Sequence, residues 1–163
     1  MTLLINESRS IMSENTQPQF ALQRVYLKDA SLEVPDAPAV FLQTWNPEVS
    51  IDLASAVTPL EDKAHYEVTV SLTVTARNEG QTAFLVEVKQ AGVFQAVGFD
   101  DAGLGPLLGA YCPNVLFPYA REAVSDLVGK ASFPQLLLQP INFDAIYAER
   151  LQQQQQQHAA VTV

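Results

Sequence analysis

Three glycines follow a predicted strand and precede a predicted helix, which is where a phosphate-binding loop would lie. They are Gly103, Gly105 and Gly109. The dinucleotide-binding fingerprint needs a βαβ unit and one residue fewer before its last glycine. Pro106 also removes a backbone donor where a phosphate would be held. The segment is therefore interpreted as a glycine-rich turn that leads into a helix, and not as a nucleotide site.

Two histidines and one cysteine are the other side chains that commonly bind metals or act as nucleophiles. His65 and His158 each lack a second histidine or cysteine at ligand spacing, so no metal site is predicted. Cys112 precedes Pro113 and has no histidine nearby in sequence, so it is interpreted as a plain buried cysteine.

Adjacent carboxylates occur at Asp100-Asp101 and at Glu61-Asp62. Paired acids can share protons in catalysis, but neighbouring acids in a loop flanked by glycine or proline are typical of a solvated turn. The sequence thus predicts no enzyme, no metal and no cofactor, and favours a binding protein.

The composition predicts one domain with an acidic surface. The chain has 163 residues, 48% of them hydrophobic, with 18 acidic and 9 basic residues and a net charge of −9. Such a charge repels nucleic acids and anionic lipids, so neither is an expected partner. No apolar run approaches the ~20 residues of a membrane-spanning helix, so no membrane insertion is expected. A single cysteine and the lack of a signal-like start favour the cytoplasm.

The pattern along the chain predicts strands first and helices afterwards, which is typical of an α+β fold. Residues 1–19 are expected to form a flexible arm, 20–151 the folded domain, and 152–163 a glutamine-rich, disordered tail. The six glutamines, 152–157, are expected either to extend the preceding helix or to fray. Apolar residues alternate over 20–34, with an interruption that indicates a bulge or a switch of faces, and over 49–54, 66–76 and 82–94. The last two strands are expected to form a hairpin. Helical spacing indicates helices over 115–128 and 142–151.

Several ordered blocks of residues resemble one family. They are LGAYCPNVLFPYARE from Leu108, FPQL from Phe133, PINFD from Pro140, R-x-Y-x-K-D from Arg24, WNPEV from Trp45 and TAFLVEV from Thr82. Together they resemble the SecB protein-export chaperones over about residues 20–151. The resemblance implies a four-stranded antiparallel sheet with C-terminal helices packed on one face, assembled as a homotetramer that is a dimer of dimers. It also implies a non-enzymatic chaperone that binds unfolded precursors, keeps them translocation-competent and delivers them to the SecA motor.

The resemblance assigns two roles to opposite faces of the strand over 82–94. The positions that it implies for precursor binding are Phe84, Val86, Val88 and Gln90. Those that it implies for SecA binding are Asp29, Glu33, Leu85 and Glu87. The three apolar residues of the first set have an equally good interpretation as core or subunit-contact residues. Without the resemblance, the acidic residues of the second set would be interpreted as a solvated face.

Two further sets of residues are candidates for binding. Phe41, Trp45, Tyr111 and Phe117 are expected either to line a groove for apolar client side chains or to pack in the core. The apolar stripe over 115–128 is expected to contact both the sheet and another subunit, through Tyr119, Ala123, Val124 and Leu127. A holding chaperone dedicated to another client, such as an antitoxin, is the alternative function. A small-ligand enzyme would need a polar pocket that the sequence does not indicate.

Overall fold

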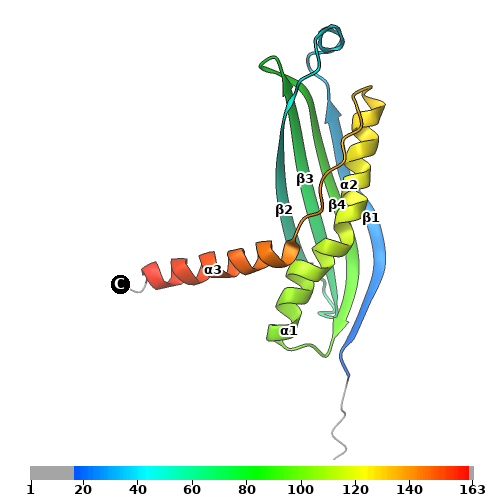
Figure 1. Cartoon of the computed structure of the whole chain (residues 1–163). Coiled ribbons are helices and arrows are strands. Elements are labelled where there is room, and N and C mark those ends of the chain that lie inside the picture. Colours follow the sequence, from blue (N-terminus) through cyan, green and yellow to red (C-terminus); the bar gives the residue numbers. More distant parts are fainter. Residues whose placement is uncertain (1–16, 162–163) are drawn as a thin grey trace, which may run out of the picture.

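The fold is a single curved antiparallel sheet with helices on one side (Figure 1). The computed structural model describes residues 17–161. Its strands are β1 (Gln19–Glu33), β2 (Glu48–Pro59), β3 (His65–Asn78) and β4 (Gln81–Val97), in the order β1-β4-β3-β2. The predicted α+β class and four-stranded antiparallel sheet are confirmed. Most of the arm expected over residues 1–19 lies outside the described residues.

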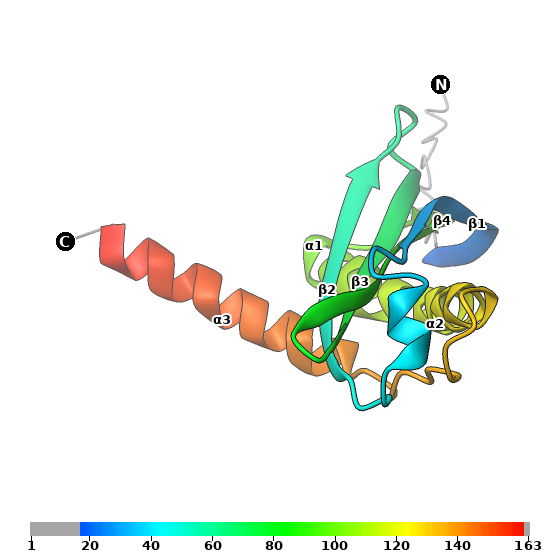
Figure 2. The ribbon, with the colours of Figure 1, turned by 90° about the horizontal axis from the view of Figure 1, so that it is seen from above.

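Helices follow the sheet, as the sequence predicts. A short 3₁₀ turn, η1 (Ala39–Leu42), lies between β1 and β2, and α1 (Asp101–Pro106), the π-helical η2 (Leu107–Tyr111) and α2 (Cys112–Lys130) follow one another directly. The Asp100 carboxylate caps α1 by accepting a hydrogen bond of 2.8 Å from the Gly103 N–H. Helix α2 packs on β4 and β3, and α3 (Phe143–Val161) then extends away from the sheet (Figures 1 and 2). Within residues 17–161 no helix is long and apolar enough to cross a bilayer.

Alternation along β3 gives the sheet two different faces. One parity is buried, and we call the face that it forms the helix face: Val68, Val70, Leu72, Val74 and Ala76. The other parity forms what we call the open face: Glu67, Thr69, Ser71, Thr73 and Thr75. The hairpin to β4 turns through Glu79 and Gly80, both with positive φ (49° and 78°), which is the conformation of a type I′ turn. The predicted hairpin is therefore confirmed.

Strand β1 contains the irregularity that its sequence predicts. Its register against β4 shifts between Leu22 and Arg24 and again between Leu27 and Asp29. Each shift inserts one residue and exchanges the faces of the residues that follow. Consequently Tyr26, which alternation placed with Phe20, lies opposite Ala91 on the open face.

Helix α2 approaches β4 closely where the strand has no side chain. A Cβ atom at Gly92 would lie 2.9 Å from the Leu116 side chain and 2.9 Å from that of Phe94. Leu116 is fully buried at this contact. Glycine at position 92 therefore lets the helix reach the sheet.

The glycines near α1 have a role that the sequence did not predict. A Cβ at Gly105 would lie 2.5 Å from the Tyr147 hydroxyl oxygen, and one at Gly109 would lie 2.5 Å from the Tyr147 ring. The two glycines are four residues apart in helical backbone, so they lie on the same side of the helix. The Tyr147 side chain packs against them. The segment is thus a helical docking site for the start of α3 and not a turn.

Helix α3 includes the glutamine run, which is one of the two outcomes that the sequence left open. Its helical backbone continues through the six glutamines to Val161. Glutamine has a high helix propensity, and no glycine or proline interrupts residues 143–161. The glutamine run therefore extends the helix, although its side chains are exposed.

Candidate protein-binding surfaces

The four residues assigned to SecA binding lie together on the open face. Glu87 of β4 is directly opposite Ser31 of β1, and Leu85 is opposite Glu33. Asp29 begins the same run on β1, immediately after the second bulge. We call Asp29, Glu33 and Glu87 the acidic patch; all three side chains are exposed. The Ser31 hydroxyl donates a hydrogen bond of 3.4 Å to the Glu87 carboxylate.

Asp52 extends this surface onto a third strand. It is opposite Thr73 on β3, and Thr73 is opposite Glu87 on β4. Neighbouring strands are about 4.8 Å apart, so Asp52 and Glu87 are about 10 Å apart across the open face. Alternation along β2 predicts that Asp52 and Ile51 lie on opposite faces of the sheet. The position of Asp52 in the same row as Glu87 follows only from the order and register of the strands.

The four positions assigned to precursor binding are buried on the helix face. Phe84, Val86, Val88 and Gln90 are exposed by 2%, 0%, 2% and 4% respectively. They lie on β4, the strand on which α2 packs most extensively. In this chain they are core residues, so any effect that they have on a bound polypeptide is exerted through the residues that they support.

Two of the predicted aromatic residues meet at one end of the sheet. The rings of Phe41 and Trp45 lie 5.4 Å and 5.0 Å from that of Phe133, measured between centroids. Phe84 lies 5.0 Å from the same ring. Phe133 therefore links the exposed Phe41 to the buried strand β4. It belongs to the FPQL block in the sequence, but its central position in the cluster depends on the fold.

The other two predicted aromatic residues lie elsewhere. Tyr111 contacts Phe20, with 5.7 Å between ring centroids, and Phe20 stacks on Phe94. Phe94 is ten residues from Phe84 along β4, which is about 33 Å in a strand. Phe117 is buried against Phe143, 5.8 Å away. The four aromatic residues therefore do not line one groove.

Apolar side chains that the sequence analysis did not single out are exposed around the Phe41 end of the sheet. Val49 and Ile51 lie on the helix face of the edge strand β2, since Ile51 is opposite Val74. With residues of η1 and of the segment between α2 and α3 they form what we call the apolar surface: Phe41 (49% exposed), Leu42 (93%), Val49 (41%), Ile51 (46%) and Leu137 (64%). Alternation along β2 indicated its apolar parity, but not that it would remain uncovered.

The four predicted interface residues of α2 differ in exposure. Tyr119 is 50% exposed, and Ala123 and Leu127 are half-buried on the same flank of the helix. Val124 is fully buried in the chain's own core. Val124 is therefore not available for direct contact with another subunit, whereas Tyr119 is.

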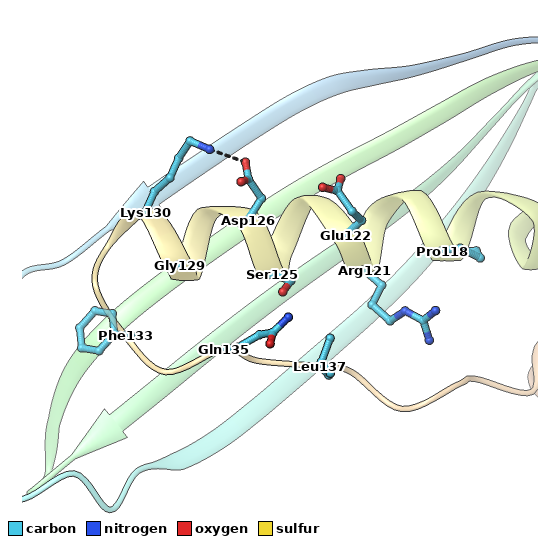
Figure 3. Close-up of a pocket in the computed structure, with 10 residues that line it drawn as sticks. All are labelled: Pro118, Arg121, Glu122, Ser125, Asp126, Gly129, Lys130, Phe133, Gln135 and Leu137. Atoms are coloured by element: carbon cyan, nitrogen blue, oxygen red, sulfur yellow. Dashed lines mark hydrogen bonds and ion pairs between the residues drawn. The ribbon is translucent and has the colours of Figure 1, made fainter.

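A cleft separates the opposite flank of α2 from the segment that follows it (Figure 3). Arg121, Ser125, Gln135 and Leu137 point toward this space. On the outer side of the helix, Lys130 and Asp126 form an ion pair of 2.6 Å. The cleft is open, and most of its charged residues, Glu122, Asp126 and Lys130, are exposed, so it resembles a hydrated surface more than a catalytic pocket.

Burial also determines the protonation state of the Cys112 thiol. Cys112 is fully buried, and this burial raises the pKa of its thiol to about 12. The thiol is consequently protonated at neutral pH and unreactive as a nucleophile. The interpretation of Cys112 as a buried structural residue is confirmed.

Comparisons with known proteins agree with this geometry. The family model "Preprotein translocase subunit SecB" matches residues 13–154. A protein-export protein SecB of Methylococcus capsulatus is 54% identical over 151 residues, covering 91% of this chain and 97% of that protein. One from Thioalkalivibrio sulfidiphilus is 56% identical over 141 residues, covering 86% and 84%.

Among solved structures, a SecB-like chaperone of Mycobacterium tuberculosis, in complex with a peptide from the HigA1 antitoxin, shares the fold. The TM-score is 0.58 with 22% sequence identity, covering 75% of this chain and 90% of that chain. The two export proteins are more than twice as similar in sequence, and the family model spans nearly the whole chain. The chain belongs to the SecB family of preprotein translocase subunits.

Proposed function

We propose that this chain is a cytoplasmic protein-export chaperone that holds unfolded precursor proteins in a translocation-competent state and delivers them to the SecA motor. The observation that carries the proposal is the division of one sheet between two surfaces. Exposed apolar side chains lie on the helix face and its connections, and an acidic patch lies on the open face. One protein can therefore hold a client and a motor at the same time.

The apolar surface suits an unfolded client. An unfolded precursor exposes apolar side chains that a folded protein buries, and their burial is favourable whatever their order in sequence. Leu42, Ile51 and Leu137 offer such burial at the surface. Phe84, Val86, Val88 and Gln90 lie below and maintain the shape of this part of the molecule.

Self-association increases the number of client sites. We propose a homotetramer, arranged as a dimer of dimers, with contacts through α2 and the edge strand β1. The exposed Leu22 and Leu27 lie on the helix face of β1, and Tyr119 is exposed on α2. Several weak apolar sites in one assembly raise the affinity for a long unfolded chain through effective concentration.

The acidic patch suits a folded partner with a cationic surface. Charge complementarity accelerates association and orients the partner without requiring deep burial. Asp29 and Glu87 lie on neighbouring strands of a regular sheet, so their spacing is fixed before binding. Such a rigid, charged surface can recognise one motor protein while the apolar surface accepts varied clients.

Binding of purified SecA tests this proposal. We expect the wild-type chain to bind SecA and the Asp29→Ala/Glu87→Ala variant to bind at least about tenfold more weakly, a difference of ~1.4 kcal/mol. Isothermal calorimetry at low and high salt measures both affinities. The matched control is Glu122→Ala/Asp126→Ala, which removes the same charge from α2.

Each outcome has a distinct meaning. No binding of SecA by the wild-type chain would contradict the export function and favour a chaperone dedicated to another client. Equal binding by the wild-type chain and the Asp29→Ala/Glu87→Ala variant would contradict the assignment of the acidic patch. Equal weakening by the control variant would show that net charge, and not this patch, is recognised.

A further inference from the structure

Glu67 connects two strands that are not neighbours in the sheet. Strand β4 separates β1 from β3, and Glu67 lies on the open face of β3. One carboxylate oxygen of Glu67 accepts a hydrogen bond from the Tyr26 hydroxyl, and the other lies 2.6 Å from the Lys28 ammonium nitrogen. Both partners belong to β1. The side chains of Tyr26 and Lys28 therefore cross over β4 to reach Glu67.

The second bulge of β1 explains how Lys28 comes to lie there. Leu27 is opposite Gln90 and Asp29 is opposite Lys89, so Lys28 is the inserted residue without a partner on β4. A bulge redirects the side chain of the extra residue. Lys28 is thus placed beside Asp29, the first residue of the acidic patch, on the same side of the sheet.

The ion pairs found within residues 17–161 include Lys28–Glu67 and Lys130–Asp126. Neither of these two pairs contains a residue of the acidic patch. Lys28 is the immediate chain neighbour of Asp29, yet its ammonium group contacts Glu67. The Lys28 ammonium group is consequently paired with Glu67 and not with Asp29, Glu33 or Glu87.

The surroundings of Glu67 keep it ionised. The hydrogen bond from Lys28 and then that from Tyr26 lower the pKa of its carboxyl, and the charge of Lys89 adds to this effect. Lys89 is the residue opposite Asp29 on β4. Glu67 therefore attracts two of the cations that lie next to the acidic patch.

We propose that Glu67 is a positioning residue for partner recognition: it holds Lys28 across β4 and thereby keeps this ammonium group from pairing with Asp29 of the acidic patch. Tyr26 orients the carboxylate by binding its second oxygen. Without Glu67, the Lys28 ammonium group can pair with Asp29 and compete with the cationic surface of the partner. This inference rests on the proposed function, in which that partner is SecA.

Substitution of both members of the pair tests the inference. We expect Glu67→Gln to weaken SecA binding about threefold, the size typical of a partly exposed ion pair, with a smaller loss at high salt. Lys28→Gln should bind at least as tightly as wild type, because it removes the competing cation. The double variant Lys28→Gln/Glu67→Gln should recover wild-type affinity. Calorimetry gives the affinities, and thermal unfolding checks that each variant is folded.

The recovery separates this role from a merely structural one. If the pair only stabilised the sheet, Lys28→Gln would weaken binding as Glu67→Gln does, and the double variant would not recover. Either that pattern or an unaltered affinity of Glu67→Gln would overturn the inference while leaving SecA binding by the wild-type chain intact. A wild-type chain that does not bind SecA would contradict the proposed function and this inference with it.

Discussion

Replacing Phe84 with alanine is expected to lower the free energy of unfolding by about 3–5 kcal/mol, the range for deleting a buried aromatic ring. The ring is 2% exposed and lies 5.0 Å from that of Phe133. Its removal leaves a cavity between β4 and the aromatic residues that support the apolar surface. Since a domain of this size is stable by only about 5–15 kcal/mol, the loss is large. Urea unfolding followed by circular dichroism measures it.

Phe41→Ala is the matched control, because it removes the same ring from the same cluster at an exposed position. Phe41 is 49% exposed, so we expect a loss of about 1 kcal/mol. The two variants should also differ in their effect on client binding. Phe41→Ala should weaken it without loss of structure, whereas Phe84→Ala should weaken it only as far as the fold is destabilised. A fully stable Phe84→Ala chain that has lost its clients would contradict the assignment of Phe84 to the core.

Replacing Val124 with aspartate is expected to prevent stable folding, and not only to divide the assembly. Val124 is 0% exposed and belongs to the hydrophobic core between α2 and the sheet. Placing a polar group there without compensation costs several kcal/mol. Far-UV circular dichroism and thermal unfolding should show a chain that is unfolded or strongly destabilised.

Tyr119→Asp tests the subunit interface without this complication. Tyr119 is 50% exposed on its own chain, so the substitution should leave the monomer folded while placing a charge in the proposed contact. Light scattering should then show species smaller than the tetramer. A full-size assembly would contradict the interface assigned to Tyr119, Ala123 and Leu127. A folded, fully stable Val124→Asp chain would contradict the burial of Val124.

Local patterns were sufficient to predict most of the elements. The alternation of Val68, Val70 and Leu72 with polar residues identified β3 and its buried face, and the Asn78 to Gln81 segment identified the hairpin. The broken alternation around Arg24 and Lys28 indicated the bulges of β1. These features depend on residues that are close in sequence, where the period of the side chains and the conformation of a turn are decisive.

Features that depend on distant residues could not be predicted in this way. The alignment of Asp52 with Glu87, and the contact of Lys28 with Glu67, follow from the order of the strands. Tyr111 is separated from Phe41 because their aromatic clusters include Phe94 and Phe84 respectively, which lie far apart along β4. The contact between the Tyr147 ring and Gly109 requires α3 to pack against η2, and no local sequence pattern predicts this packing.

The parity of β4 shows both the strength and the limit of a sequence pattern. It correctly placed Phe84 and Val86 on one face and Glu87 on the other. It could not decide whether the apolar face was covered, since a covered strand and an exposed binding strand have the same alternation. Helix α2 covers it, and exposed apolar side chains lie instead on the edge strands β1 and β2 and on the connections.

Binding of the same precursor protein in its unfolded and folded states tests the central claim most directly. The precursor is diluted from denaturant into buffer with or without the wild-type chain, and complex formation is followed by size-exclusion chromatography with light scattering. The account predicts a stable complex and suppressed aggregation with the unfolded precursor, and no complex with the folded protein. Failure to bind the unfolded precursor, or equal binding of the folded form, would contradict it.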